Sequence, residues 1–229
     1  MPAQGPAPDY EQIVAASDRT PADQALDAGR KPLALLQFMG VRTDWRVADL
    51  GAGDGYTTEL LARAVGPQGK VYAQNPAMVI EKFVKESWPA RLARPINSNV
   101  VRVDQEFDAP LPSGAKNLDA VIMNLFYHDL YWLGTDRAAM NRAIFRALKP
   151  GGIYVIIDHS SKEGSGVSEV KTLHRVEEVV VRDDVLGAGF RLADSADFLR
   201  NPQDTRDQTV FEEQKRGTTD RFVLKFVKP

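Results

Sequence analysis

Residues 46–58 constrain the fold of this chain more than any other segment. They begin as an apolar run typical of a buried strand, pass through Gly51, Gly53 and Gly55, and continue with helical spacing. Glycine reaches positive φ and lets a ligand approach the backbone closely, because it has no Cβ. The turn also aims the free N–H groups of a helix start at whatever lies beside it. The segment predicts a strand–turn–helix unit with a ligand site at the turn; a tight turn without a ligand is the alternative.

The composition indicates one domain and excludes several classes of function. The chain has 229 residues, with 29 basic and 31 acidic side chains and a net charge of -2. This balance argues against a general binder of nucleic acid or of membrane surfaces, and there is no run of 18 apolar residues. With no cysteine, the chain has no disulfide, thiol nucleophile or cysteine-bound metal.

Strand-like and helix-like segments alternate along the rest of the chain, which predicts an α/β fold. Apolar runs without alternation are typical of strands covered on both faces. Two strands at the end are joined by a polar loop at 201–219, which favours an antiparallel hairpin. We therefore expect a Rossmann-like, doubly wound, seven-stranded and mostly parallel sheet with a C-terminal antiparallel hairpin, preceded by N-terminal helices. The expected strands after the first are 70–74, 99–104, 118–125, 153–157, 190–198 and 221–227, and the expected later helices are 78–88, 137–148 and 167–186, with 149–152 closing the second of these.

The glycine turn reads Asp-x-Gly-x-Gly-x-Gly from Asp49 to Gly55, which differs from the Gly-x-Gly-x-x-Gly of dinucleotide folds. It resembles motif I of class I S-adenosylmethionine (SAM) methyltransferases. Residues 118–121 and 148–152 resemble the starts of that family's fourth and fifth strands. The resemblance implies SAM as cofactor, an N-terminal extension with lid helices over residues 1–40, and a methyltransferase domain over 41–229. A solvated face is the alternative for the polar residues of the N-terminal helices.

A closer resemblance links the chain to a group of predicted bacterial methyltransferases of unestablished substrate. It is carried by residues 124–129, 157–161, 172–175 and 197–202. Several members of that group have a secretory leader, whereas residues 1–8 here lack the features of one. Because SAM chemistry belongs in the cytoplasm, we expect a cytoplasmic protein as given; export is the alternative if a leader was removed before Met1.

The resemblance also implies a set of cofactor contacts. The glycine turn would lie under the methionine part of SAM, and an acid after the third strand would bond the adenine amino group. The second strand departs from the family, because it ends in amides where an acid usually grips the ribose hydroxyls. A neutral acceptor binds more weakly, so we expect SAM affinity in the micromolar range or weaker. The predicted contacts are Asp49, Gly51, Gly53, Gly55, Tyr56, Thr57, Gln74, Asn75, Asp104, Gln105 and Asn124.

The three histidines follow elements that end at one edge of the predicted sheet. His128 follows the fourth strand, His159 follows the fifth, and His174 lies near the start of the next predicted helix. Ligands of open α/β sheets bind beyond the carboxyl ends of the strands. We therefore predict His159 as the first candidate and His128 as the second candidate for a catalytic base. A structural hydrogen bond is the alternative for each.

The remaining site predictions concern the acceptor and a metal. Tyr127, Asp158, His174 and Arg175 are predicted to orient or contact the substrate, although a surface salt bridge is the alternative for Arg175. The residues His128, Asp129, Asp158 and His159 could bind a divalent ion as in catechol-type methyltransferases, but their spacing does not match those enzymes. We therefore predict no metal.

We interpret the chain as an enzyme, a SAM-dependent methyltransferase that methylates an oxygen or nitrogen of a small molecule. The predicted partner is that substrate, without nucleic acid or membrane, and a homodimer is an open alternative. A SAM-binding fold with little or no transferase activity is the first alternative function, supported by the missing acid. A nicotinamide-dependent dehydrogenase is the second, and it lacks its glycine pattern here.

Overall fold

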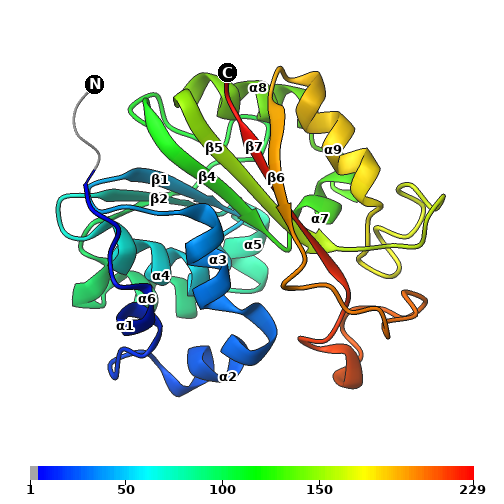
Figure 1. Cartoon of the computed structure of the whole chain (residues 1–229), viewed down its shortest axis with the longest axis horizontal. Coiled ribbons are helices and arrows are strands. Elements are labelled where there is room, and N and C mark those ends of the chain that lie inside the picture. The colour runs from blue at the N-terminus through cyan, green and yellow to red at the C-terminus, as the bar shows by residue number, and fades with distance from the viewer. Residues whose placement is uncertain (1–4) are drawn as a thin grey trace.

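The structure, a computed structural model that describes residues 5–229, is built around one seven-stranded sheet (Figure 1). The strand order is β3-β2-β1-β4-β5-β7-β6, and every neighbouring pair is parallel except those of β7, which runs antiparallel to β5 and β6. The predicted fold class is confirmed. The strands are β1 (Arg46–Leu50), β2 (Lys70–Gln74), β3 (Val100–Val103), β4 (Leu118–Asn124), β5 (Leu148–His159), β6 (Arg191–Ala196) and β7 (Arg221–Val227).

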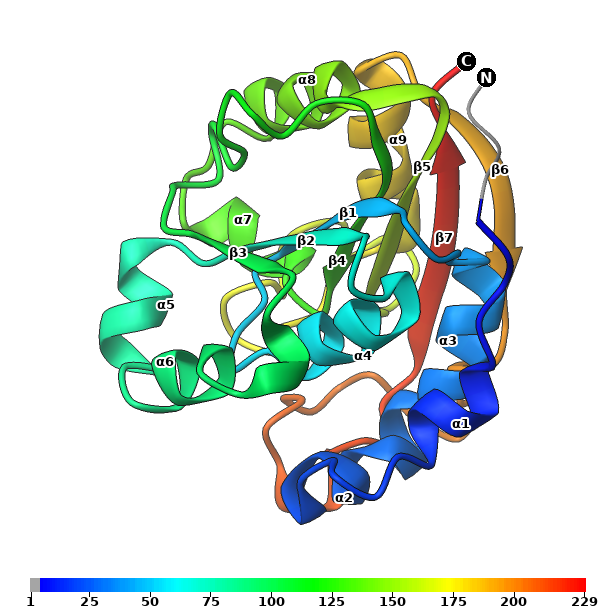
Figure 2. The same ribbon diagram turned by 90° about the vertical axis from the view of Figure 1, so that its left-hand side faces the viewer.

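Helices cover both faces of this sheet (Figure 2). One face carries α7 (Tyr127–Trp132), α8 (Arg137–Ala147) and α9 (Glu178–Gly187). The other carries α1 (Tyr10–Val14), α3 (Pro32–Met39) and α4 (Tyr56–Val65), with α2 (Pro21–Arg30) extending beyond it. The shorter α5 (Ala77–Lys82), α6 (Ser87–Leu92) and η1 (Pro95–Asn97) lie beside β2 and β3, and η2 (Glu213–Lys215) lies in the loop before β7.

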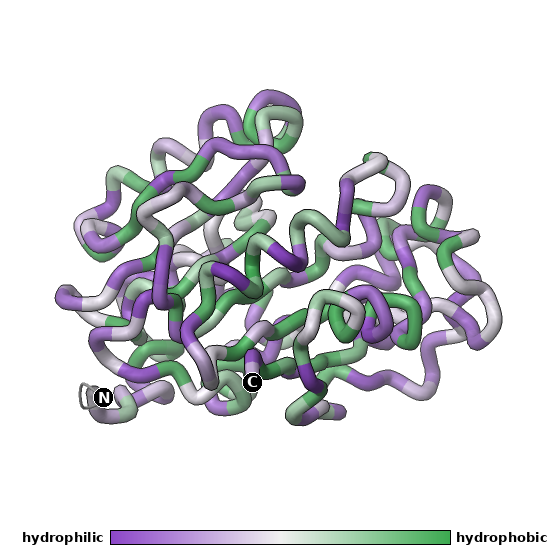
Figure 3. The backbone as a smooth tube through the Cα atoms, turned by 90° about the horizontal axis from the view of Figure 1, so that it is seen from above, coloured by the Kyte–Doolittle hydropathy of each residue, from purple (hydrophilic) through white to green (hydrophobic). Residues whose placement is uncertain are grey.

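The central strands are apolar on both sides because each side packs against a helical layer. In β4, Val121 and Met123 contact the layer of α8 and α9, whereas Ala120 and Ile122 contact the layer of α3 and α4. All four are completely buried, and burying a side chain such as Ile122 stabilises the fold by about 1.5–3 kcal/mol. Hydrophilic residues gather in the outer loops of the chain (Figure 3). This two-sided burial explains why the strands show no polar alternation.

The strand order reverses between β1 and β4, and this switch places the candidate site. The chain moves outward from β1 through β2 to β3, then returns to β4 on the other side of β1. The connections diverge at that point and leave a crevice at the carboxyl ends of β1 and β4. The glycine turn follows β1, His128 lies just after β4, and His159 is the last residue of β5.

Several predicted boundaries are corrected by the structure. The helix expected over 167–186 is confined to α9, because residues before it form turns that return to β5, where the Val176 N–H donates to the His159 carbonyl. The helix expected over 78–88 is two helices, and Pro89 lies in the first turn of α6, where a missing N–H is tolerated. Residues 149–152 do not close a helix but begin β5, through an irregular register with β4.

Two further findings concern the chain as a whole. Within residues 5–229, no helix combines the length and apolar character needed to cross a membrane. Of the segment 1–8 that we compared with a leader, residues 1–4 lie outside the described part of the chain.

Candidate active site

The glycine turn is shaped by its packing as well as by its backbone. Gly51, Gly53 and Gly55 have φ of 65°, 59° and 88°. A Cβ on Gly51 would lie 2.9 Å from the Phe126 ring, and one on Gly55 would lie 2.8 Å from Trp88. A Cβ on Gly53 would meet nothing within 4 Å. Two of the three glycines are therefore required by neighbouring side chains, and the middle one faces open space.

A cavity of about 170 Å³ lies beside this turn. The backbone of the turn, the start of α4, the end of β4 and one side chain from α2 line this cavity. Five residues that we predicted to contact the cofactor line it, which are Asp49, Gly51, Gly53, Thr57 and Asn124. The other lining residues are Arg30, Ala52, Asp54, Leu125 and Phe126.

Asp49 anchors the turn from below. Its side chain is buried, and its Oδ2 accepts a 2.6 Å hydrogen bond from the Thr58 hydroxyl. Burial raises the pKa of this carboxyl to about 7, and the Thr58 hydrogen bond opposes the rise. The bond ties the end of β1 to the first turn of α4, which fixes the path of the glycines between them.

Helix α2 lies over the same region and brings Arg30 to the cavity. Its Asp27 accepts a 2.7 Å hydrogen bond from the Tyr56 hydroxyl, and the Arg30 guanidinium lies 4.5 Å from the centre of the Tyr56 ring. Our prediction that Tyr56 contacts the cofactor is not supported, because its side chain is 2% exposed and holds α2 instead. A second link is the buried Arg91, which pairs with Asp23 of α2 at 2.5 Å and with Glu59 of α4 at 2.8 Å.

The amides at the end of β2 are also occupied by the protein. The Oε1 of Gln74 accepts from the Gly51 N–H at 3.0 Å, and its Nε2 donates to the Gln105 carbonyl at 2.6 Å. Asn75 bonds both the N–H and the carbonyl of Gly53, each at 2.9 Å. Both amides are completely buried. They stabilise the glycine turn in this structure, and contact between these amides and the ribose stays a prediction.

Two more predicted contacts lie away from the cavity. Asp104 is exposed just after β3 and pairs with Arg102 of that strand at 2.8 Å, and Gln105 contributes its backbone carbonyl to Gln74. Neither lines the cavity beside the glycine turn. Gly55 does not line it either, because it packs against α6. The sequence predicted the turn and placed Arg30 among the polar residues that could form a lid over it, but did not assign Arg30 as a cofactor contact.

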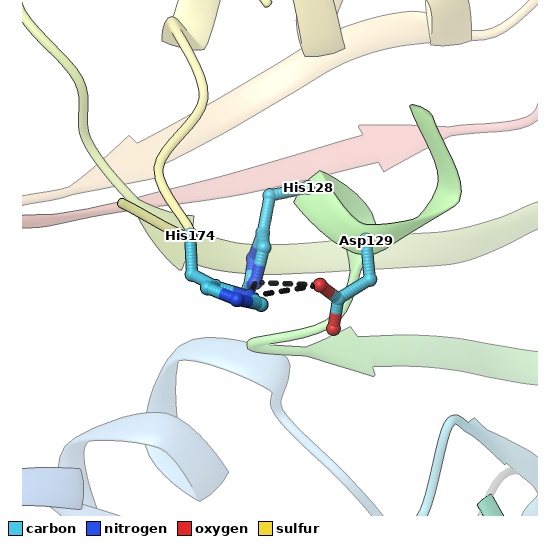
Figure 4. A group of neighbouring side chains, drawn as sticks. All are labelled: His128, Asp129 and His174. Carbon is cyan, nitrogen blue, oxygen red and sulfur yellow. Dashed lines mark hydrogen bonds and ion pairs between the residues drawn. The ribbon is translucent and has the colours of Figure 1, made fainter. Parts of the chain in front are cut away.

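The histidines meet at the same edge of the sheet, as their positions after β4 and β5 predicted. The ring centre of His128 lies 5.9 Å from that of His159 and 5.3 Å from that of His174. Asp158 orients His128 twice, because one carboxylate oxygen accepts from the His128 backbone N–H and the other contacts its Nδ1, both at 2.7 Å. His174 lies on the loop after β5, with φ of 55° (Figure 4).

The pKa values of His128 and His159 are shifted in opposite directions because their surroundings differ. Burial acts to lower the pKa of His128, but the carboxylates of Asp158 and Asp129 outweigh it and raise the value to about 10. Burial lowers the pKa of His159 well below its usual value, and the neighbouring His128 adds to this effect. The Nδ1 of His159 contacts the Thr219 hydroxyl at 2.8 Å, and its Nε2 makes no hydrogen bond within residues 5–229. His159 thus combines a free nitrogen with a lowered pKa that favours the neutral form a base needs, whereas the raised pKa of His128, our second candidate, favours its protonated form in the absence of a metal ion.

The predicted substrate residues are mostly interior. Tyr127 is completely buried, and its hydroxyl accepts a 2.8 Å bond from Asn141. Arg175 is completely buried and pairs with Asp204 at 2.8 Å, which fastens the loop before β7. Asp158 is completely buried beneath His128. These three cannot contact a substrate here, because being adjacent to a site in sequence does not determine which way a side chain points. His174, which is partly exposed, stays a candidate.

The ligand set that we considered for a metal is not assembled. The Asp158 carboxylate is bonded to His128 and to the His159 backbone N–H, and the His159 Nδ1 faces Thr219. A different group of donor atoms does converge. The side chains of His128, Asp129 and His174 place one ligand atom each within 4.8 Å of one another (Figure 4).

Comparison with known proteins shows which proteins this chain is similar to. Residues 48–156, which include the glycine turn, β4 and most of β5, match the model of the methyltransferase domain family. These residues are therefore similar to a methyltransferase domain, in agreement with the resemblance to class I SAM-dependent methyltransferases. The chain is 28% identical over 171 residues to the ubiquinone/menaquinone biosynthesis C-methyltransferase UbiE of Pasteurella multocida, in an alignment that covers 70% of this chain and 61% of that protein. The chain thus spans less than two thirds of the length of this relative.

Solved structures show the same fold. A SAM-dependent methyltransferase from Aquifex aeolicus superposes with a TM-score of 0.63 at 20% identity, over 96% of this chain and 99% of that one. Aeropyrum pernix fibrillarin, solved with natively bound SAM, superposes with a TM-score of 0.57 at 17% identity, over 88% of this chain and 76% of fibrillarin.

The residues of the cavity fit the amino-acid end of SAM. Gly53 leaves open space where a side chain would otherwise stand, and the start of the ten-residue helix α4 presents free N–H groups. Arg30 supplies a guanidinium suited to a carboxylate, and the Asn124 amide, which donates to Thr57 at 3.2 Å, has an oxygen that can accept from an ammonium. These residues would hold the methionine part, as the glycine turn predicted.

Proposed function

We propose that this chain transfers the methyl group of SAM to an oxygen or nitrogen of a small-molecule acceptor. The observation that carries the proposal is the position of His159, an imidazole with a free Nε2 at the same sheet edge as the glycine-turn cavity. The balanced charge of the chain supports a small acceptor over a nucleic acid.

One set of residues binds the cofactor, and a different residue accepts the proton. The glycine turn, Arg30 and Asn124 would hold the amino-acid end of SAM and fix its direction. Bound SAM would supply an activated methyl group, with its sulfonium sulfur as the leaving group. The Nε2 of His159 would take the proton of the acceptor O–H or N–H as the lone pair of that acceptor atom attacks the methyl group. Most of the rate acceleration comes from aligning the acceptor atom with the methyl group, and rigid helices and strands provide that alignment.

The test uses His159→Gln and measures S-adenosylhomocysteine formed from SAM with a panel of phenols, hydroxy acids and amines. We expect the variant to lose about 10²–10⁴-fold in kcat for any accepted substrate, because a positioned base contributes that much. Its dissociation constant for SAM should match wild type, since His159 does not line the cavity. Equal kcat in variant and wild type would contradict the role of His159.

Two alternatives have specific support. Carbon methylation is the activity printed for UbiE, so quinols are included in the panel. A SAM-binding protein with little transferase activity is favoured by the buried amides of Gln74 and Asn75, which leave no acceptor at the ribose position. SAM binding by calorimetry without product from any acceptor would support the second alternative.

A further inference from the structure

Three side-chain atoms near the histidine pair form an almost equilateral triangle. The Nε2 of His128 lies 3.2 Å from the Oδ1 of Asp129 and 3.3 Å from the Nδ1 of His174. The third side, from the Nδ1 of His174 to the Oδ1 of Asp129, is 3.1 Å. The atoms come from two different segments, the first turn of α7 and the loop after β5 (Figure 4).

Hydrogen bonds alone do not account for this triangle. Each ring nitrogen carries at most one hydrogen, which can point at one partner, so at most two of the three sides are good hydrogen bonds. The Oδ1 of Asp129 already accepts a 2.7 Å bond from the Trp132 indole. A cation in contact with all three atoms would satisfy every side at once.

The size of the triangle fits a first-row divalent metal. Ligands about 2.1 Å from an ion lie about 3.0 Å apart in octahedral geometry and about 3.4 Å apart in tetrahedral geometry. The observed sides of 3.1–3.3 Å fall between these values. An ion with bonds of about 2.1 Å would sit about 1 Å outside the plane of the three atoms, with its remaining coordination positions directed to that side.

We propose that His128, Asp129 and His174 form a binding site for a divalent transition-metal ion, with Zn²⁺ the best match. Two imidazoles and one carboxylate suit Zn²⁺ and its first-row neighbours, whereas Mg²⁺ and Ca²⁺ prefer oxygen ligands. Three protein ligands leave room for a water molecule or a substrate atom, as in catalytic rather than structural zinc sites.

The surroundings of the ligands have the form that metal sites require. Asp158 contacts the Nδ1 of His128 at 2.7 Å, which leaves the Nε2 as the ligand atom. A carboxylate behind a metal-binding histidine is the usual way to fix its tautomer and orientation. Trp132 holds Asp129 in the same manner. The positive φ of His174, 55°, is unfavourable for a residue with a side chain and shows that the surrounding loop enforces this conformation.

Two exposed aromatic rings border the site. The ring of Phe211, 58% exposed, lies 4.6 Å from that of His174, and the ring of Trp132, 40% exposed, lies 6.4 Å from it. An acceptor with an apolar ring could pack against these two aromatic side chains. An oxygen substituent on that ring could then take a free coordination position on the metal. This assignment of the acceptor rests on the proposed function, whereas the metal site does not.

The site is tested by titrating the full-length, chelator-treated chain with ZnCl₂ in a calorimeter, with MgCl₂ as comparison. We expect one equivalent of Zn²⁺ to bind, and Mg²⁺ to bind far more weakly. Co²⁺ in place of Zn²⁺ gives visible absorption bands that report nitrogen and oxygen ligands. The ligand variants are His174→Ala and Asp129→Asn, and each should weaken Zn²⁺ binding by at least ~100-fold, while Asp158→Asn should cost about 10–100-fold.

His159→Gln is the matched control, because it removes a neighbouring histidine that is outside the triangle. It should bind Zn²⁺ as wild type does. Circular dichroism checks that each variant folds, and Asp129→Asn keeps the shape of the side chain if His174→Ala does not fold. No Zn²⁺ binding by wild type, or undiminished binding by a folded ligand variant, would overturn the proposal.

The titration is independent of methyl transfer, so the two proposals can fail separately. A chain that binds Zn²⁺ at these residues and forms no product retains the metal site and refutes the proposed function. A chain that methylates an acceptor after chelation and binds no Zn²⁺ retains the function and refutes the metal site.

Discussion

Replacing Gln74 with glutamate would restore the acid that related methyltransferases have at the end of the second strand. By the family pattern, Gln74→Glu should improve SAM binding. The structure predicts the opposite, because the amide is buried and both of its ends are used. A carboxylate can still accept from the Gly51 N–H but has no hydrogen to donate to the Gln105 carbonyl.

The expected loss of stability follows from that missing donor. The lost hydrogen bond contributes about 0.5–1.5 kcal/mol, and an unpaired buried carbonyl costs about 1–3 kcal/mol. We therefore expect the free energy of unfolding to fall by about 2–4 kcal/mol at neutral pH. SAM affinity should also fall, since Gln74 holds the Gly51 end of the turn.

The loss should depend on pH in one direction. A protonated carboxyl has a donor and an acceptor in the same places as the amide, so the folded state favours protonation and raises the pKa of the introduced group. Below the unfolded-state pKa of about 4.3, the introduced carboxyl is protonated in both states and does not lower the free energy of unfolding. As pH rises through the raised folded-state pKa, the carboxyl ionises in the folded protein and the free energy of unfolding falls. The gap between variant and wild type should therefore be smaller at about pH 5 than at about pH 8.

Urea unfolding at both pH values and calorimetry with SAM check these expectations. Lys70→Gln is the control, because Lys70 is exposed at the start of the same strand, and its effect should stay within about 0.5 kcal/mol. A Gln74→Glu variant that is as stable as wild type at about pH 8, and that binds SAM more tightly, would refute the structural role of the amide.

Two further predictions concern the helix over the cavity. Arg30→Met should weaken SAM binding about tenfold while leaving the melting temperature nearly unchanged, since it removes a charge beside the cavity at a partly exposed position; unchanged affinity in calorimetry would exclude Arg30 as a ligand for the carboxylate. Arg91→Leu should lower the free energy of unfolding by about 3–5 kcal/mol in urea, because Asp23 and Glu59 lose a buried partner. A loss below about 1 kcal/mol would show that these carboxylates find other partners.

Most of the fold could be predicted from local sequence. Apolar runs and glycine punctuation located every strand, and the polar loop before the last one predicted the antiparallel end of the sheet. Helix boundaries were less accurate where long-range contacts decided them. Residues 167–177 have helical spacing, but the backbone bond from Val176 to His159 holds that segment against β5.

The sequence by itself determined the glycine turn and the edge of the sheet at which the histidines meet, because both depend on backbone conformation and strand direction. The tertiary structure decided which polar side chains remain available there. Gln74 and Arg175 follow strands that lead to the site, yet each bonds to a distant segment and is buried. Asp129 and His174 are 45 residues apart and become neighbours only through folding. Side-chain partners depend on packing between distant segments, and a local pattern contains no information about that packing.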